Sequence, residues 1–149
     1  MSVFKIGAFP QKITERFDVE GKIKSIAVSC DGTMYACAEE GLIKFVNGKG
    51  YQLFADGSFT KVYCDKNGRV FATKDKNVYQ ITDNGAIAFA EFDYPVVDLK
   101  GDDKLYVLTV NSLHVEDDDG FFTLQEMEQP ERSLAVSGDK VCVASELCL

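Results

Sequence analysis

The sequence contains no tryptophan, one histidine and three prolines in 149 residues. A zinc site of the usual Cys/His type has few ligands to draw on, because the five cysteines show no CxxC spacing and only His114 can join them. No apolar run approaches the ~18–20 residues that a membrane-spanning helix needs. Residues 1–5 lack the basic stretch and long apolar segment of a secretory signal. We therefore expect a cytoplasmic protein with no membrane partner.

Basic residues are also in short supply. The chain has 16 Lys and Arg against 24 Asp and Glu, which gives a net charge of −8. Nucleic-acid binding depends on clustered basic residues that neutralise phosphates, so no nucleic-acid partner is expected. The Gly-rich phosphate loop, the GxSxG elbow and the HExxH motif are all missing. We predict a protein that is not an enzyme, with no catalytic residues, no cofactor and no metal site.

The cysteines are present in an odd number, and three of the five fall inside apolar strand patterns. Buried cysteine packs as a small apolar residue, and disulfides are rare in reducing compartments. We expect reduced packing cysteines, with Cys148 near the C-terminus the most reactive. The five are Cys30, Cys37, Cys64, Cys142 and Cys148.

Four turn-forming dipeptides recur along the chain. Asp31-Gly32 and Asn67-Gly68 lie 36 residues apart, and Asp102-Asp103 and Gly138-Asp139 follow at spacings of 35 and 36. Asn, Asp and Gly tolerate the positive φ that two-residue hairpin turns require. The spacing predicts four repeats of about 36 residues, each containing such a hairpin.

Short runs rich in β-branched and aromatic residues flank these turns. Strand a precedes each turn, at residues 23–28, 59–64, 96–99 and 133–136, and strand b follows it, at residues 34–37, 70–73, 105–108 and 141–144. Strand c comes next at residues 42–45, 78–81 and 113–115, then a more polar strand d at residues 51–54, 87–89 and 121–124. Four up-and-down strands joined by short turns make a propeller blade. The predicted fold class is all-β: a β-propeller built of four ~36-residue, four-stranded antiparallel blades.

The two ends of the chain complement each other. Residues 2–6 resemble residues 41–45, a strand c, and residues 12–14 fall where strand d is expected. The C-terminal repeat supplies strands a and b. Together the ends make one blade, the closure by which propellers remove open sheet edges, unless residues 2–6 are simply one more strand-like pentamer. We predict a single domain with blades at 22–57, 58–93 and 94–129, and a composite blade from 130–149 plus 1–21.

The blade core resembles several propeller families. Asp31-Gly32-Thr33-Met34-Tyr35-Ala36, followed by Gly41-Leu42-Ile43-Lys44-Phe45, is similar to NHL-type, two-component-regulator-type and tectonin-type blades. The resemblance covers nearly the whole chain at the level of the fold. The sequence departs from WD40 blades, because it has no Trp, and from kelch blades, because it lacks a Gly-Gly pair in each repeat. The resemblance therefore implies the architecture and transfers no site residues.

The loops between strands b and c and between strands d and a are expected on one face of a propeller, around the central channel, where ligands commonly bind. We predict a recognition surface there, although ordinary solvated loops remain the alternative for any single residue. The equivalent loops differ from one another, which argues against four identical ligand sites. The candidate residues are Glu39, Glu40, Asp56, Lys74, Lys76, Asp93 and Tyr94.

Two other features have ordinary structural explanations. His114 lies between Leu113 and Val115 in a predicted strand and faces away from both; no Cys or Ser is placed beside it by the sequence. We expect a surface or inter-blade histidine. The acidic residues 116–119 lack the spacing of an EF-hand loop, which favours a solvated turn over a calcium site.

Our first functional hypothesis is a non-catalytic protein-interaction or scaffold module that presents loops on a propeller face. The alternative is a small-ligand or carbohydrate-binding propeller of tectonin-like type, for which Tyr94 is the only exposed aromatic residue in the candidate loops. A third hypothesis is a structural subunit of a larger assembly. The protein partner is not identified by the sequence.

The assembly has three possible forms. Four blades of this size make a tight ring, so two chains could instead close an eight-bladed ring by exchanging terminal strands, with residues 2–6 pairing with the partner's residues 140–145. The alternatives are a closed four-bladed monomer and a half-propeller completed by a different protein. We predict the homodimer.

Overall fold

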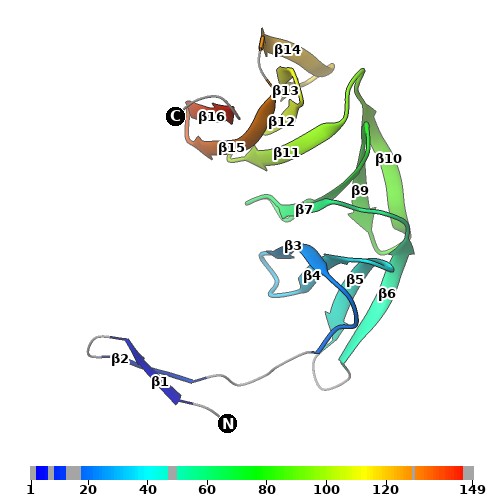
Figure 1. Ribbon diagram of the computed structural model, residues 1–149, viewed down its shortest axis with the longest axis vertical. Coiled ribbons are helices and arrows are strands. Elements are labelled where there is room, and N and C mark those ends of the chain that lie inside the picture. Colours follow the sequence, from blue (N-terminus) through cyan, green and yellow to red (C-terminus); the bar gives the residue numbers. More distant parts are fainter. Residues whose placement is uncertain (1–2, 7–8, 13–17, 47–49, 129, 146–149) are drawn as a thin grey trace.

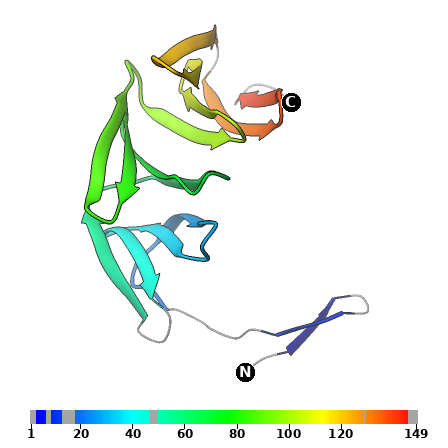
Figure 2. The same ribbon diagram turned by 180° about the vertical axis from the view of Figure 1, so that it is seen from behind.

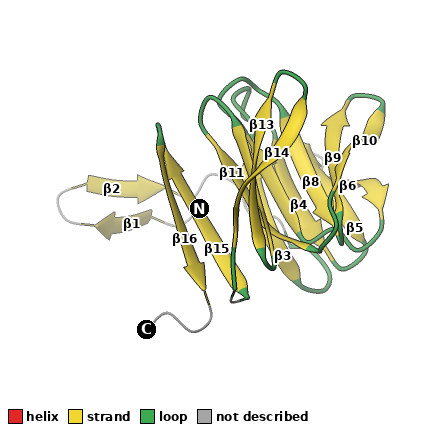
Figure 3. Cartoon of the chain, turned by 90° about the horizontal axis from the view of Figure 1, so that it is seen from above, coloured by secondary structure: helices red, strands yellow, loops and turns green. Residues whose placement is uncertain are grey.

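The computed structural model describes residues 3–6, 9–12, 18–46, 50–128 and 130–145, and the side chains of all of these except 3–6, 9–12, 46 and 131. The described residues form strands and turns without a helix, so none of them forms a helix that could cross a membrane (Figure 3). The strands are β1 (Val3–Ile6), β2 (Phe9–Lys12), β3 (Ile23–Val28), β4 (Met34–Ala38), β5 (Gly41–Val46), β6 (Gly50–Asp56), β7 (Lys61–Cys64), β8 (Val70–Lys74), β9 (Asn77–Thr82), β10 (Gly85–Glu91), β11 (Val96–Gly101), β12 (Leu105–Thr109), β13 (Ser112–Asp117), β14 (Gly120–Glu126), β15 (Glu131–Ser137) and β16 (Lys140–Ser145).

Consecutive antiparallel strands form the sheets. Three sheets have four strands in sequence order, which we name blade 1 (β3–β6), blade 2 (β7–β10) and blade 3 (β11–β14). Two sheets have two strands, β1–β2 and β15–β16, and we name β15–β16 the half-blade. The predicted fold class, an all-β protein of repeated four-stranded blades, is confirmed. Along the described chain β1–β2 and β15–β16 are separate sheets, so the composite blade stays a prediction, and residues 1–2, 7–8, 13–17 and 146–149 of it lie outside the described residues.

The predicted two-residue turn at Gly138-Asp139 is present, since it joins the paired residues Ser137 and Lys140, whereas the turns at Asp31-Gly32 and Asn67-Gly68 are wider. In blade 1 the Ser29 backbone N–H donates to the Thr33 oxygen over 2.8 Å, and the Gly32 N–H donates to the Ser29 oxygen over 2.9 Å. Gly32 has φ 86°, whereas Asp31 has no positive φ. The Asp31 carboxylate instead accepts the Thr33 N–H over 2.9 Å. This side-chain cap favours the wider turn over the two-residue form. The turn between β7 and β8 repeats these backbone hydrogen bonds, and there the carboxylate of Asp65, the residue equivalent to Ser29, accepts the Arg69 N–H over 2.8 Å.

The core lies between blades. Each blade has a front face toward the preceding blade in the chain and a back face toward the following one. Buried layers join the back of blade 1 to the front of blade 2, the back of blade 2 to the front of blade 3, and the back of blade 3 to the half-blade. Figures 1 and 2 show the result: the blades follow one another along an open arc, with β3–β6 at one end and β15–β16 at the other. The largest fully buried side chains are Phe71, Leu42, Ile43, Leu99, Leu105 and Leu108.

Hydrogen bonds reinforce each blade-to-blade contact along the inner strands. The Ser25 hydroxyl in β3 accepts the Val62 N–H of β7 over 3.1 Å. The Tyr63 hydroxyl donates to the Gly101 oxygen over 2.6 Å and accepts the Gly101 N–H over 3.0 Å. Side chains thus satisfy backbone groups of the neighbouring blade that no sheet partner reaches.

Candidate functional site

The loops between the second and third strands of each blade, and the loops that connect one blade to the next, gather at one end of the blades. The Val96 N–H, at the start of blade 3, donates over 2.8 Å to the oxygen of Asp75, in the turn between β8 and β9. Asp75 has φ 53°, a left-handed conformation that Asp tolerates better than most residues. The Val110 N–H donates over 3.1 Å to the Pro95 oxygen. We name this end of the molecule the loop face.

All seven residues predicted as a recognition surface lie in loop-face turns or at the strand ends beside them, and all seven are exposed. Glu39 and Glu40 form the turn between β4 and β5, and Lys74 and Lys76 flank the turn between β8 and β9. Lys74 lies against Gly57, in the loop that follows Asp56. The remaining two, Asp93 and Tyr94, lie together in the loop between blades 2 and 3.

Asp93 and Tyr94 line a pocket of about 220 Å³ that none of the other five predicted residues enters. The pocket lies between the loop from blade 2 to blade 3 and the strands β13 and β14. Most of its lining is polar, and it holds the carboxylates of Asp93 and Glu126. The lining residues are Asp93, Tyr94, Asn111, Ser112, His114, Thr123, Glu126 and Met127.

His114 is bound to a hydroxyl group on each side. Its Nε2 lies 2.8 Å from the Ser112 Oγ, and its Nδ1 lies 3.2 Å from the Thr123 Oγ1. Ser112 Oγ lies in turn 2.6 Å from the Thr109 Oγ1. The imidazole packs against the Phe92 ring, with 4.8 Å between centroids. These contacts hold the ring in one orientation at the wall of the pocket.

The expectation that no Cys or Ser lies beside His114 is wrong, because Ser112 contacts the imidazole. Ser112 precedes His114 by two positions on the same strand, so both side chains emerge on one face, and Thr123 is the cross-strand partner of His114. In the sequence, the signal for the contact between Ser112 and His114 was their spacing of two positions along a predicted strand. The partner across the sheet depends on register, which is a property of the folded hairpin.

Burial lowers the pKa of His114 below its usual value of 6.5, and the nearby Asp93 charge opposes the shift only in part. The imidazole is therefore neutral near pH 7 and can both donate and accept a hydrogen bond. Negative charge in the pocket comes from Asp93 and Glu126. The arrangement is chemically suited to bind a small polar or cationic group.

The acidic stretch that follows His114 is divided between two roles. Glu116 lies in β13 and its carboxylate accepts hydrogen bonds from Arg69 of blade 2. Asp117, Asp118 and Asp119 are exposed at the β13–β14 turn, where the Asp117 carboxylate accepts the Asp119 N–H over 2.9 Å. Among the described residues, no three His, Cys, Asp or Glu side chains gather as a metal site.

Known structures with the same architecture include natural and designed proteins. The extracellular domain of BT4673 from B. thetaiotaomicron, described as a hybrid two-component system protein, superimposes with a TM-score of 0.71 at 17% identity over 89% of this chain and 21% of that one. The extracellular domain of BT3049 from the same organism gives a TM-score of 0.63 at 16% identity over 96% of this chain and 24% of that one. The computationally designed protein Ika4 gives 0.66 at 14% identity over 91% and 92% of the two chains.

These similarities show the fold. The chain spans about a fifth of the BT4673 domain that it matches. No protein-family model matches the sequence, and no curated protein matches it. The predicted resemblance to propeller families is therefore confirmed only as a repeated β-sheet architecture like that of two-component-system extracellular domains. The chain is not assigned to NHL-type or tectonin-type repeats.

The predicted cytoplasmic location is wrong. The natural proteins among these structures are extracellular domains, which contradicts a cytoplasmic assignment made from the N-terminal residues and composition. Composition and net charge govern solubility, and they carry no information about the compartment.

Proposed function

We propose that the protein is a non-catalytic recognition module, and that the pocket beside Asp93, Tyr94 and His114 receives a basic side chain of a protein partner. The observation that carries this proposal is the pocket itself, which combines two carboxylates with a neutral, hydrogen-bonded histidine. Its volume of about 220 Å³ is below the ~300–1,000 Å³ typical of pockets for drug-sized ligands. A lysine or arginine side chain is small enough for such a site and carries the complementary charge.

The geometry around His114 argues against hydrolytic chemistry. Ser112 lies within hydrogen-bonding distance of the imidazole, as a nucleophile would. The other ring nitrogen, however, meets the Thr123 hydroxyl and not a carboxylate that would stabilise an imidazolium. The Ser112 side chain is also buried and shared with Thr109. A structural role for the hydroxyl–histidine network fits these contacts better than acyl transfer.

A carbohydrate or other small polar ligand is the second candidate for this pocket. Tyr94 is 48% exposed at its rim, which leaves an aromatic face free to stack on a sugar ring, and hydrogen-bonding groups lie beside it. The equivalent loops of the other blades carry different residues, so we do not expect this pocket to recur around the arc. One such site per chain is therefore the form that this alternative takes.

The compartment we propose is extracellular, in keeping with the natural proteins that share the fold. A recognition module on a rigid blade scaffold suits a sensing role, in which binding of a partner at this site is the event that is sensed. The supporting feature is the rigidity of the site, which rests on two packed blades and a hydrogen-bonded histidine.

The test is an NMR titration of the ¹⁵N-labelled protein with three probes: N-acetyl-arginine amide, N-acetyl-lysine amide and a panel of monosaccharides. We expect the cationic probes to shift the amide resonances of Asp93, His114 and Thr123 in a saturable way. Shifts with a monosaccharide alone would instead support the second candidate. If no probe shifts these resonances, the pocket is not the recognition site.

Two matched variants complete the experiment. Asp93→Asn removes one carboxylate from the pocket, and we expect it to weaken binding of the cationic probes about tenfold, since one charge-assisted hydrogen bond is worth roughly 1.5–3 kcal/mol when buried and less here at the rim. Asp56→Asn removes an exposed carboxylate at the end of β6, beside the equivalent loop between blades 1 and 2 and outside the pocket. Equal weakening by both variants would indicate nonspecific attraction to an acidic protein.

A further inference from the structure

One core position recurs in the first strand of every repeat, and its exposure changes abruptly at one end of the arc. Ile26, Val62, Leu99 and Leu134 each lie on the front face, opposite Ala36, Ala72, Val107 and Val143 of the next strand. Val62, Leu99 and Leu134 are 5%, 1% and 3% exposed, whereas Ile26 is 73% exposed. Ile26 differs because no blade of the described chain precedes it.

The opposite change occurs at the other end. On the second strand of each repeat, the residue after the front-facing one points to the back face. These residues are Cys37, Thr73, Leu108 and Ala144. The first three are fully buried, Cys37 and Leu108 within the layers that face the following blade, and Ala144 is exposed on β16. The described chain therefore presents one uncovered front face, on blade 1, and one uncovered back face, on the half-blade.

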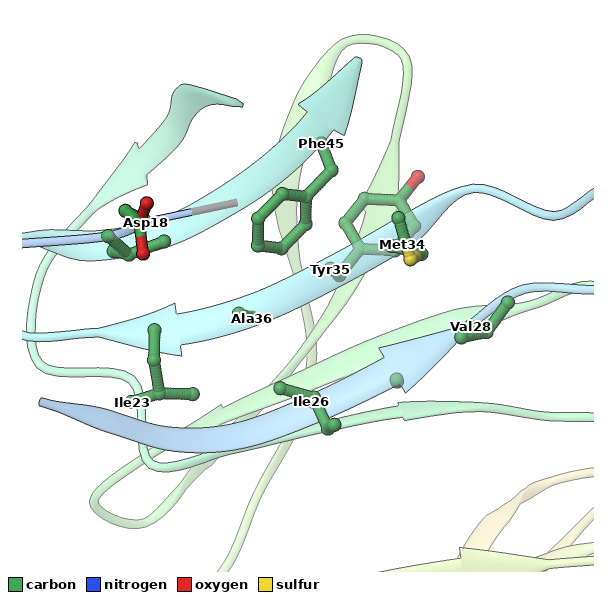
Figure 4. A pocket seen from close by; sticks show the side chains of 10 residues that line it. Asp18, Ile23, Ile26, Val28, Met34, Tyr35, Ala36 and Phe45 are labelled. Carbon is green, nitrogen blue, oxygen red and sulfur yellow. The ribbon is translucent and has the colours of Figure 1, made fainter. Parts of the chain in front are cut away.

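The uncovered front face is apolar and hollowed. It contains a pocket of about 440 Å³, lined at one side by Asp18 (Figure 4) and by Val19. Figure 4 shows Ile23 and Ile26 on β3, and Phe45 on β5, lining this pocket. Val28, which is also on β3, is 60% exposed. Exposed apolar side chains gathered on one sheet face indicate an interaction surface.

We propose that a second copy of this chain covers this face, with the half-blade of each copy packing its back against blade 1 of the other. The complementarity comes from the repeat. Every internal blade contact joins a front to a back, and the two uncovered faces are the missing members of that series. Two such contacts related by a twofold axis close a ring.

A polar position in the repeat supports the same register. Ser25 and Asp98 are equivalent, and at two of the three internal blade contacts they accept the N–H of the core residue on the next inner strand, Val62 for Ser25 and Leu134 for Asp98. Ser133 holds this position in the half-blade. In the proposed ring, Ser133 lies where its hydroxyl accepts the N–H of Ile26 in the second copy.

Closure by a second copy leaves the existing packing unchanged. Figures 1 and 2 place β3 and β15 at opposite ends of the arc, so bringing them together within one chain requires tighter rotation at each internal blade contact. Those contacts are close-packed, with Cys37, Phe71 and Leu108 fully buried, and close-packed layers resist such rotation. A second copy of the chain supplies the missing blades, and the internal blade contacts of each copy need no tighter rotation.

The sheet composition agrees with this assembly. Each copy has three whole blades, and the two-stranded sheets β1–β2 and β15–β16 are two halves of the four-stranded pattern. Joining β15–β16 of one copy to β1–β2 of the other gives an eight-bladed ring. The proposal is independent of the loop-face pocket, which lies between blades 2 and 3 and is complete within one chain.

The test is light scattering on a size-exclusion column across a dilution series, with three variants. We expect the wild type at twice the chain mass of 16.5 kDa. Ile26→Lys and Ala144→Lys each place a charge in the proposed contact, and both should run as single chains, with the dissociation constant raised by roughly a hundredfold or more. The control, Ile87→Lys, changes an apolar residue of blade 2 that is 50% exposed and should remain a dimer. Circular dichroism checks that all variants fold.

Mixing the two dissociated variants distinguishes the ring from other dimers. A pair made of one Ile26→Lys chain and one Ala144→Lys chain keeps one unaltered front-to-back contact, so we expect mixing to restore part of the two-chain mass. A wild type that stays at one chain mass at all concentrations would overturn the proposal. Dimerisation of Ala144→Lys but not of Ile26→Lys would overturn it too, because it indicates front-to-front pairing. Masses that grow beyond two chains would indicate an open filament and would also overturn the closed ring.

Cys142 provides an independent readout. It is exposed on β16, on the same back face as Ala144. Because thiol modification requires access, we expect iodoacetamide to modify it roughly tenfold more slowly in the concentrated wild type than in Ile26→Lys. Equal rates in the two proteins would contradict burial of this face.

Discussion

Arg69 of blade 2 donates two hydrogen bonds, each 2.8 Å long, to the carboxylate of Glu116 in blade 3. The guanidinium also donates through Nε to Asp65 over 2.7 Å, and it lies 5.1 Å from the centroid of the Phe71 ring. The pair therefore joins the turn of one blade to a strand of the next, 47 positions away in the sequence. A bidentate Arg–carboxylate pair constrains both distance and orientation between the blades.

The first prediction concerns this pair. Glu116→Gln should lower the free energy of unfolding by about 1–3 kcal/mol, because it removes a charged partner from a largely buried contact. Urea denaturation measures the change. Asp118→Asn is the matched control, since Asp118 is exposed at the turn of the same hairpin. Equal stability of the two variants would show that the pair contributes nothing measurable.

The same pair predicts a pH dependence. Hydrogen bonds from Arg69 hold the pKa of Glu116 below its usual 4.5. A carboxyl whose folded pKa is lowered contributes stability that is present above the unfolded pKa and is lost as the pH falls through the folded pKa. The stability difference between the wild type and Glu116→Gln should therefore be constant from neutral pH to about 5 and shrink below about 4.5. Urea titrations at several pH values test this, and a difference that persists at the lowest pH would contradict it.

The third prediction concerns the contact between blade 3 and the half-blade. The buried Asp98 carboxylate accepts the N–H of Leu134 and the N–H of Leu99, each over 3.0 Å. Asp98→Ala leaves a buried donor without its partner, so we expect a loss of about 1–3 kcal/mol in urea denaturation. Asp98→Asn keeps one acceptor oxygen and should lose less. The interpretation fails if the two variants are equally stable.

A fourth prediction concerns Gly41, at the start of β5. Its φ is 147°, and a Cβ there would lie 2.3 Å from the backbone oxygen of Ala55. Gly41→Ala combines backbone strain with a clash that no flexible side chain can relieve, so we expect a loss of about 2 kcal/mol or more. Gly32→Asn is the control, because the space around Gly32 is open and Asn tolerates its φ of 86°. Thermal unfolding followed by circular dichroism should show a much smaller shift for the control.

The last prediction concerns the cysteines. Burial raises the pKa of Cys37 to about 12 and that of Cys64 to about 11, whereas Cys30 is exposed. The thiolate is the reactive form, so at pH 8 iodoacetamide should modify Cys30 in the native protein and leave Cys37 and Cys64 intact. Peptide mass spectrometry measures the sites. Modification of all three at similar rates would contradict the burial. Cys148, predicted to be the most reactive, lies outside the described residues.

Much of the blade architecture was predictable because its signals are local. Alternating apolar residues and turn residues at a spacing of about 36 predicted the strands of the three whole blades, and the structure contains a strand at each of these places. The width of the turn at Asp31 was not predicted, because the side-chain cap on Thr33 competes with the two-residue form. The pattern of residue types is the same for both turn geometries.

The candidate site was predictable in part. Asp93 and Tyr94 were identified from their loop, and the histidine from its strand, but nothing in the sequence combines these elements into a pocket. The partnership of Arg69 with Glu116 was equally hidden, since it depends on how two blades face each other. Contacts between distant residues follow from packing angles, which local patterns do not encode.

The sequence by itself determined which residues form strands and which of their faces are apolar, because alternation along a strand is a property of neighbouring residues. Ile26, Val62 and Leu99 are indistinguishable by that criterion. Only the tertiary structure decided that Val62 and Leu99 are buried and Ile26 is not. Burial requires a second surface, and whether a blade stands in front of a given sheet depends on how the blades are arranged in space.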